Sequence, residues 1–233
     1  MIHSFQLQNV KAVLFTQRIN LSKPIEIAGS FMSNAGIGNL YNGQPMILPI
    51  PQDAPSEIPR IILKNANKSY ACNISQDRID FTFSRKEAHA TLQDVSNTFL
   101  NHLISHVEVI NNNLRVSIIR VGVVVTLIFP LKESSNKFVS EKFLKEHLFE
   151  NSYEVQIGIL KREQLAGFET NCWFKMNTLR NKKDQSDDRA LLIAYDVNTL
   201  PEKLFDLNRD QVSIFYNSSI KYISDSLKVY FME

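Results

Sequence analysis

The order of predicted elements repeats along the chain, and each half reads as a strand, a helix, three strands and a long helix. The first copy ends in an amphipathic segment near residues 88–107, and the second ends in a longer one near residues 208–231. Strands closed by a helix, occurring twice, are typical of a duplicated α+β unit whose sheets pack on helices. We therefore predict an internally duplicated α+β fold of βαβββα units, with antiparallel sheets packed against long helices. The halves are residues 1–112 and 113–233, which form either two domains or one continuous domain.

Composition excludes some classes of function. The 233 residues are 44% hydrophobic and 21% charged, which is ordinary for a globular protein with an adequate core. Because 26 Lys and Arg residues nearly balance 24 Asp and Glu residues, the net charge is only +2. This balance argues against a general binder of nucleic acid or of membrane surfaces, although it permits a local basic patch.

Several features favour a cytoplasmic protein with no membrane partner. Cys72 and Cys172 each lie in a strand-like run, so we expect buried, reduced thiols. Residues 1–6 lack the charged and apolar regions of a signal peptide. The most apolar stretch, Val116–Leu131, is interrupted by Arg120 and is too short to span a bilayer as a helix.

The first half begins with a largely buried strand predicted over residues 5–19. A short helix is predicted after Pro24, because the fixed φ of proline suits the first helical turn. Five of the eight prolines lie between residues 41 and 59, and this density predicts an extended surface connection. Three short strands follow at residues 60–64, 69–74 and 78–84, separated by turn-forming residues.

The second half opens with residues 114–130, a β-branched run that is too apolar for an exposed edge strand. A short helix is predicted over residues 138–148, and strands are predicted over residues 153–163, 168–179 and 190–198. Residues 180–189 contain no apolar side chain, which predicts a mobile loop. The closing helix carries a broad apolar stripe.

Several short motifs recur in one order along the chain: Pro59–Leu63, Tyr70–Ile74, Arg78–Phe81, Ile118–Gly122 and Ala194–Val197. In this order they resemble an uncharacterised, sporadically distributed bacterial protein family of similar length. The patchy distribution of that family implies mobile genes and a place in a defence or toxin-linked system. The resemblance implies no site residues.

Catalytic and cofactor-binding signatures are absent from the sequence. His102 and His106 share one helix face at i and i+4, but a third ligand at zinc-site spacing is missing. The glycine cluster Asn34–Asn39 lacks the Lys-Ser/Thr of a phosphate loop, so a turn is expected there. We therefore predict no catalytic residues, no metal and no cofactor. A hydrolase or nuclease assembled from distant residues such as Asp80 and His106 is one remaining alternative.

A second alternative is a nucleic-acid or nucleotide binder that uses a basic, aromatic sheet face. Tyr70 and Trp173 could stack on bases if their rings point outward. Acidic residues are interleaved with the basic ones, which is typical of an ordinary solvated face. The basic residues predicted to contact nucleic acid are Arg60, Lys64, Arg78, Lys175, Lys182 and Lys183.

The function that we expect is that of a non-enzymatic cytosolic interaction or regulatory protein. It would act as an accessory or immunity component of a bacterial defence or toxin-linked system, through an unknown protein partner. The expectation rests on the missing catalytic signature and on the family resemblance. The predicted contact surfaces are the proline-rich segment 41–59 and the polar loop 180–189.

Overall fold

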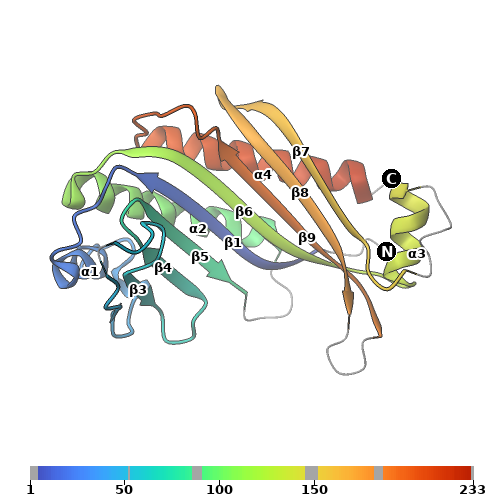
Figure 1. The fold of residues 1–233 in the computed structure, drawn as a ribbon, viewed down its shortest axis with the longest axis horizontal. Coiled ribbons are helices and arrows are strands. Elements are labelled where there is room, and N and C mark those ends of the chain that lie inside the picture. Colours follow the sequence, from blue (N-terminus) through green and yellow to red (C-terminus); the bar gives the residue numbers. More distant parts are fainter. Residues whose placement is uncertain (1–4, 52, 86–90, 145–151, 181–185, 232–233) are drawn as a thin grey trace.

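A computed structural model of the chain describes residues 5–51, 53–85, 91–144, 152–180 and 186–231 (Figure 1). These residues form an α+β fold, as the sequence predicts, with a nine-stranded antiparallel sheet in the order β2-β3-β4-β5-β1-β6-β9-β8-β7. The strands are β1 Gln6–Thr16, β2 Met46–Ile47, β3 Ile61–Lys64, β4 Tyr70–Ile74, β5 Arg78–Ser84, β6 Ile118–Pro130, β7 Gln156–Leu165, β8 Phe168–Arg180 and β9 Asp187–Thr199. The helices are α1 Pro24–Met32, α2 Leu92–Glu108, α3 Ser135–Val139 and α4 Arg209–Phe231.

The sheet is continuous across the middle of the chain. Strands β1 and β6 pair antiparallel at its centre, and β5 and β9 extend it on either side. One cluster of buried side chains includes residues from both parts of the chain. The division of the chain into halves at residues 112 and 113 stays a prediction.

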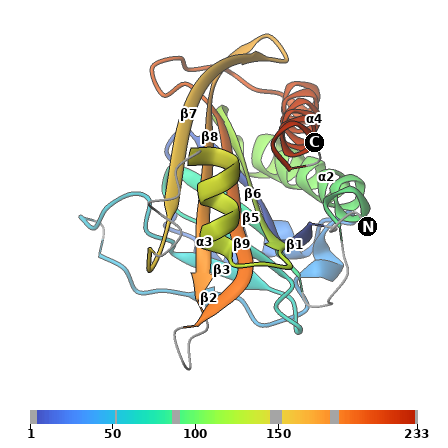
Figure 2. The ribbon, with the colours of Figure 1, turned by 90° about the vertical axis from the view of Figure 1, so that its right-hand side faces the viewer.

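One face of the sheet is covered by α2 and α4, which lie on the same side of it (Figure 2). Every second residue of a strand points to that face, so Val10, Ala12 and Leu14 of β1 are buried beneath the helices. Phe99 of α2 joins the layers, because its ring stacks on Phe81 of β5 at 4.6 Å between centroids.

The start of α2 is fixed by a capping box. The Thr91 hydroxyl accepts from the backbone N–H of Asp94, and the Asp94 carboxylate accepts from the backbone N–H of Thr91. The helix then presents its apolar residues to the sheet and to α4, where Tyr216 donates its hydroxyl proton to the carbonyl of Ser96 at 3.3 Å.

The opposite face of the described sheet carries no helix, and we call it the helix-free face. Residues paired across neighbouring strands share a face, so the register places Asp80 beside Val13, and Asp196 beside Val124 and Trp173. The face carries Lys11, Val13 and Phe15 of β1, Arg78 and Asp80 of β5, Arg120, Gly122 and Val124 of β6, Trp173 and Lys175 of β8, and Asp196 and Asn198 of β9.

Several element boundaries differ from the prediction. The helix predicted over residues 138–148 begins earlier, as α3 at Ser135, and continues as a π-helical turn to Leu144; residues 145–151 lie outside the described residues. The predicted loop 180–189 is shorter, because Arg180 of β8 still pairs with Asp187 of β9; residues 181–185 are not among those described. The strand predicted from residue 114 begins only at Ile118. A π-helical turn extends to Leu114, and Arg115, which follows it, has a φ of 54°.

Candidate binding site

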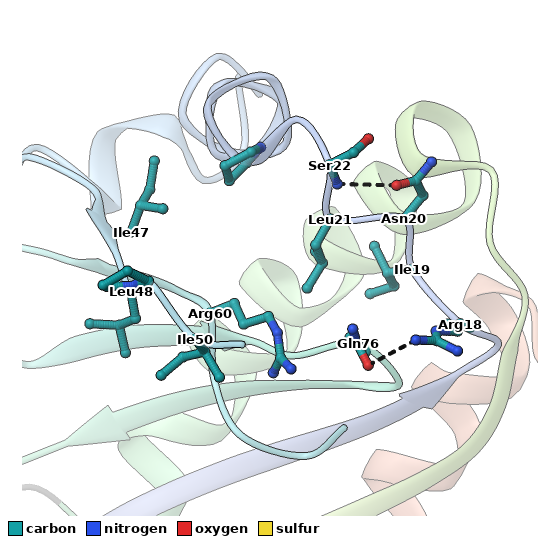
Figure 3. A pocket seen from close by; sticks show the side chains of 12 residues that line it. Arg18, Ile19, Asn20, Leu21, Ser22, Ile47, Leu48, Ile50, Arg60 and Gln76 are labelled. Carbon is teal, nitrogen blue, oxygen red and sulfur yellow. Dashed lines mark hydrogen bonds between the residues drawn. The ribbon is translucent and has the colours of Figure 1, made fainter. Parts of the chain in front are cut away.

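A cavity of about 540 Å³ lies beside the proline-rich segment, between the chain that follows β1 and the chain that follows β2 (Figure 3). Ile47, Leu48 and Ile50 lie on one side of it, and Ile19 and Leu21 lie on the other (Figure 3). The cavity is lined by Arg18, Ile19, Asn20, Leu21, Ser22, Pro24, Ile47, Leu48, Pro49, Ile50, Arg60 and Gln76.

Backbone hydrogen bonds hold the two walls in place. The N–H of Ile19 donates to the carbonyl of Gln76 at 2.6 Å, which fixes the chain after β1 against the β4–β5 turn. On the other wall, the N–H of Leu48 donates to the carbonyl of Arg60 at 2.8 Å, which continues the pairing of β2 with β3. The cavity therefore depends on tertiary hydrogen bonds between segments far apart in sequence.

Arg60 anchors the proline-rich segment from below the cavity. The residue is 7% exposed, and its guanidinium donates to the carbonyls of Ile58 at 2.9 Å and of Pro51 at 3.1 Å. A further bond reaches the carbonyl of Ala54 at 3.4 Å. Arg60 was predicted to contact nucleic acid, but its donors face the carbonyls of its own chain.

The lining of the cavity is positively charged. Arg18 is exposed and donates to Oε1 of Gln76 at 3.4 Å, and Arg60 lies deeper (Figure 3). Neither arginine forms an ion pair with a residue in the described part of the chain, and no Asp or Glu lines the cavity. The site therefore combines aliphatic walls with two cations, a combination suited to an apolar anion.

The helix-free face holds a second group of polar residues. Arg78 donates two hydrogen bonds to Asp80, at 2.7 and 2.9 Å, so this predicted nucleic-acid contact is held by a carboxylate. The Arg120 guanidinium lies 4.4 Å from the ring centroid of Phe15. Two cationic groups therefore flank the Phe15 ring, since Arg78 also lies over it at 5.6 Å.

Asp196 lies among cations on the same face. Burial raises the pKa of the Asp196 carboxyl, and the charges of Lys175, Arg78 and Lys11 oppose that rise. The Asn198 amide donates to its Oδ1 at 2.9 Å. The alternation of side chains along β1 and β9 indicates which residues of each strand share a face with Lys11 or with Asp196. It does not indicate that both strands lie near the centre of one sheet.

Of the two aromatic residues predicted to stack on bases, one lies on the helix-free face. Trp173 is 37% exposed, and Nζ of Lys175 lies 5.6 Å from its ring centroid. Tyr70 is on the helix-covered side instead, where its ring packs on Phe81 at 5.8 Å. Lys64 is exposed at the end of β3 on the helix-free face, and Lys182 and Lys183 lie outside the described residues.

Of the two histidines of α2, His106 is packed into the core and His102 is only partly buried. His106 is fully buried, and its Nδ1 donates to the carbonyl of His102 at 2.7 Å. Burial lowers the pKa of His106 to about 3, and burial also lowers the pKa of His102. In the part of the chain that the structure describes, no group of three His, Cys, Asp or Glu residues could hold a metal ion.

The remaining sequence motifs have structural roles. Cys72 and Cys172 are free, buried thiols whose pKa values are raised by burial. The glycine cluster Asn34–Asn39 forms a turn at the end of α1, where a Cβ on Gly38 would lie 2.3 Å from the carbonyl oxygen of Met32. Glycine is therefore required there for the close approach of two backbone segments.

The chain matches no protein-family model, and no curated protein is significantly similar to it. Within the described residues, none of the helices has the length and apolar character needed to cross a membrane.

Proposed function

We propose that the protein is a binding protein that captures a protein partner at the cavity between the proline-rich segment and α1. The observation that carries the proposal is the cavity itself, whose two aliphatic walls come from separate segments. Its surroundings include large apolar side chains in solvent: Ile25 is 74% exposed, Met46 is 51% exposed and Ile47 is 39% exposed. Exposed apolar side chains gathered around a concavity are typical of interaction sites.

The partner belongs to a bacterial defence or toxin-linked system, in which this chain is an accessory or immunity component. The family resemblance supports this part of the proposal. The position of the cavity is consistent with it, because the walls include part of the segment 41–59 that was expected to contact a partner.

Partner capture with matched variants tests the proposal. The tagged full-length protein is recovered from its native host as wild type, as Ile47→Asp and as Val229→Asp, and bound proteins are quantified by mass spectrometry. Val229 is the control, because it is 59% exposed on α4 and does not line the cavity. We expect Ile47→Asp alone to reduce recovery of a specific partner by about tenfold or more. Equal recovery with all three proteins would contradict the proposal.

A second candidate function is the binding of single-stranded nucleic acid on the helix-free face. It is supported by Trp173, which is partly exposed and carries Lys175 beside its ring. Lys11 lies on the same face, and Arg78 balances Asp80. Binding of a labelled oligothymidine that weakens with salt and is lost in Trp173→Ala would support this function. Absence of binding at low salt would exclude it.

The internal duplication is likewise a proposal, and the order of the elements supports it. Apart from the two-residue strand β2, which precedes β3 and has no counterpart in the second half, the first half runs β1, α1, β3, β4, β5, α2, and the second runs β6, α3, β7, β8, β9, α4. Read outward from the central β1–β6 pair, the sheet continues as β5, β4, β3 on one side and as β9, β8, β7 on the other. Each half therefore contributes its strands in the same order relative to the centre.

A further inference from the structure

We infer that the cavity binds the C-terminal carboxylate of an apolar peptide, namely the end of the partner chain; this rests on the proposed function. The one ligand chemistry that the lining favours is a carboxylate attached to aliphatic side chains. The argument combines the charge of the lining, the nature of the walls and the free edge of β2.

Charge complementarity identifies the anion. Arg18 and Arg60 both line the cavity, and none of the described residues that line it is acidic. Arg60 is buried, and its guanidinium is bound to carbonyl groups, which leave its positive charge uncompensated by a carboxylate of the described chain. An incoming carboxylate would supply the missing negative charge. The exposed Arg18 guanidinium can donate to it, and hydrogen bonds between guanidinium and carboxylate groups are among the strongest in proteins.

The aliphatic walls of the cavity favour a ligand with aliphatic side chains. Ile19 and Leu21 face Ile47, Leu48 and Ile50 across the cavity (Figure 3), and the lining contains no aromatic residue. Aromatic side chains, on which bases commonly stack, are missing from the described lining, so the walls favour an aliphatic ligand over a base. The volume of about 540 Å³ lies within the range of about 300–1,000 Å³ that is usual for ligand sites, which accommodates a few aliphatic side chains.

The free edge of β2 favours a peptide over a small carboxylate. The N–H of Leu48 donates to the carbonyl of Arg60, so the neighbouring pair Ile47 and Ile61 is of the type that exchanges no hydrogen bonds. The N–H and C=O of Ile47 therefore point away from β3, at the edge of the sheet and beside the cavity. An extended chain end can pair with these groups while its carboxylate reaches the arginines.

A peptide panel tests the inference on the purified full chain. Fluorescein-labelled tetrapeptides carry every combination of Val, Leu, Ile and Phe at the last two positions, each as a free carboxylate and as a carboxamide. Binding is followed by fluorescence anisotropy up to about 1 mM protein. We expect saturable binding of at least one carboxylate peptide, with its carboxamide at least about tenfold weaker.

Variants locate the binding. Arg18→Gln removes an exposed guanidinium of the lining, and Arg209→Gln is the control because Arg209 pairs with Glu108 away from the cavity. We expect Arg18→Gln to weaken the carboxylate peptide by about tenfold and to leave the carboxamide unchanged, which is the coupling that a double-mutant cycle measures. Arg209→Gln should bind both forms as the wild type does.

Three outcomes would overturn the inference. They are no saturable binding by any carboxylate peptide, equal affinity for carboxylate and carboxamide, and displacement of the peptide by decanoate at an affinity equal to its own. The last result would assign the site to a small aliphatic carboxylate. If Ile47→Asp abolishes partner capture while the peptides fail, the proposed function stands and only the chain-end assignment falls.

Discussion

Tyr41 Oη lies 2.5 Å from Nε2 of His106, and both side chains are almost wholly removed from solvent. Because Nδ1 of His106 donates to the carbonyl of His102, Nε2 is the acceptor and the Tyr41 hydroxyl is the donor. The pair ties the segment after α1 to the last turn of α2, through a polar contact that packs against Phe31 and Phe81.

Acid should destabilise the protein through His106. Burial lowers the pKa of His106 from its ordinary value of 6.5 to about 3 in the folded protein. Between about pH 6.5 and pH 3 the unfolded chain binds a proton at His106 and the folded protein does not. The contribution of His106 to the free energy of unfolding is therefore complete above pH 6.5 and falls as the pH drops toward 3. The slope reaches at most about 1.4 kcal/mol per pH unit. Urea unfolding at pH 7.5 and pH 5 should show a smaller pH effect in His106→Gln than in the wild type.

Removing the Tyr41 hydroxyl should also destabilise the fold. Tyr41→Phe keeps the ring but leaves Nε2 of His106 buried without a donor, which should cost about 1–3 kcal/mol in the free energy of unfolding. Tyr70→Phe is the matched control, because no hydrogen bond of the Tyr70 hydroxyl to a described residue is present. Chemical denaturation of both variants compares the two, and equal stability would refute the importance of the buried contact.

Loss of Arg60 should release the proline-rich segment. Arg60→Leu removes the donors to Ile58, Pro51 and Ala54, and we expect a loss of about 1–3 kcal/mol together with faster proteolysis within residues 51–58. Arg60→Lys should rescue only part of this, because an ammonium cannot reproduce the planar fork. Limited proteolysis with mass spectrometry locates the cleavage, and an unchanged cleavage pattern in Arg60→Leu would contradict the anchoring role.

Neutralising Asp196 should not destabilise the sheet at neutral pH. The pKa of Asp196 is raised mainly by burial, so its ionised form is disfavoured in the folded protein, and this cost appears as pH rises above the ordinary value of 3.8. Asp196→Asn removes the cost and keeps the size of the side chain. Thermal unfolding at pH 7 should give a Tm equal to or above that of the wild type, whereas a clear drop would show that attraction to Lys11 and Lys175 dominates.

Turns, the start of a helix and the face of a strand residue could be predicted from the sequence, because each depends on a few neighbouring residues. The turns at residues 65–68 and 75–77 separate β3, β4 and β5 near the predicted positions, and Pro24 begins α1 as expected. Tyr70 shares its parity with the buried Cys72 and Ile74, so alternation alone indicates the helix-covered side. The outward orientation that stacking on bases requires was therefore at odds with a signal already present in the sequence.

The cavity could not be predicted, because its walls meet only in the folded chain. Nothing near Ile19 or Leu21 in sequence indicates that Ile47 and Ile50 lie opposite them. The β1–β6 pairing that joins the sheet is also long-range. Composition indicated that β6 is not an exposed edge strand, but it did not indicate which strand would pair with it.

The two ends of the sheet bear on how the protein behaves at high concentration. A long flat edge strand invites pairing with a second molecule and growth into aggregates. Here one end is β2, which is only two residues long, and the other end is β7, whose middle carries Lys161, Arg162 and Glu163. The short length of β2 and the charged side chains of β7 both disfavour pairing with a second molecule, so the wide sheet does not become a template for fibrous assembly.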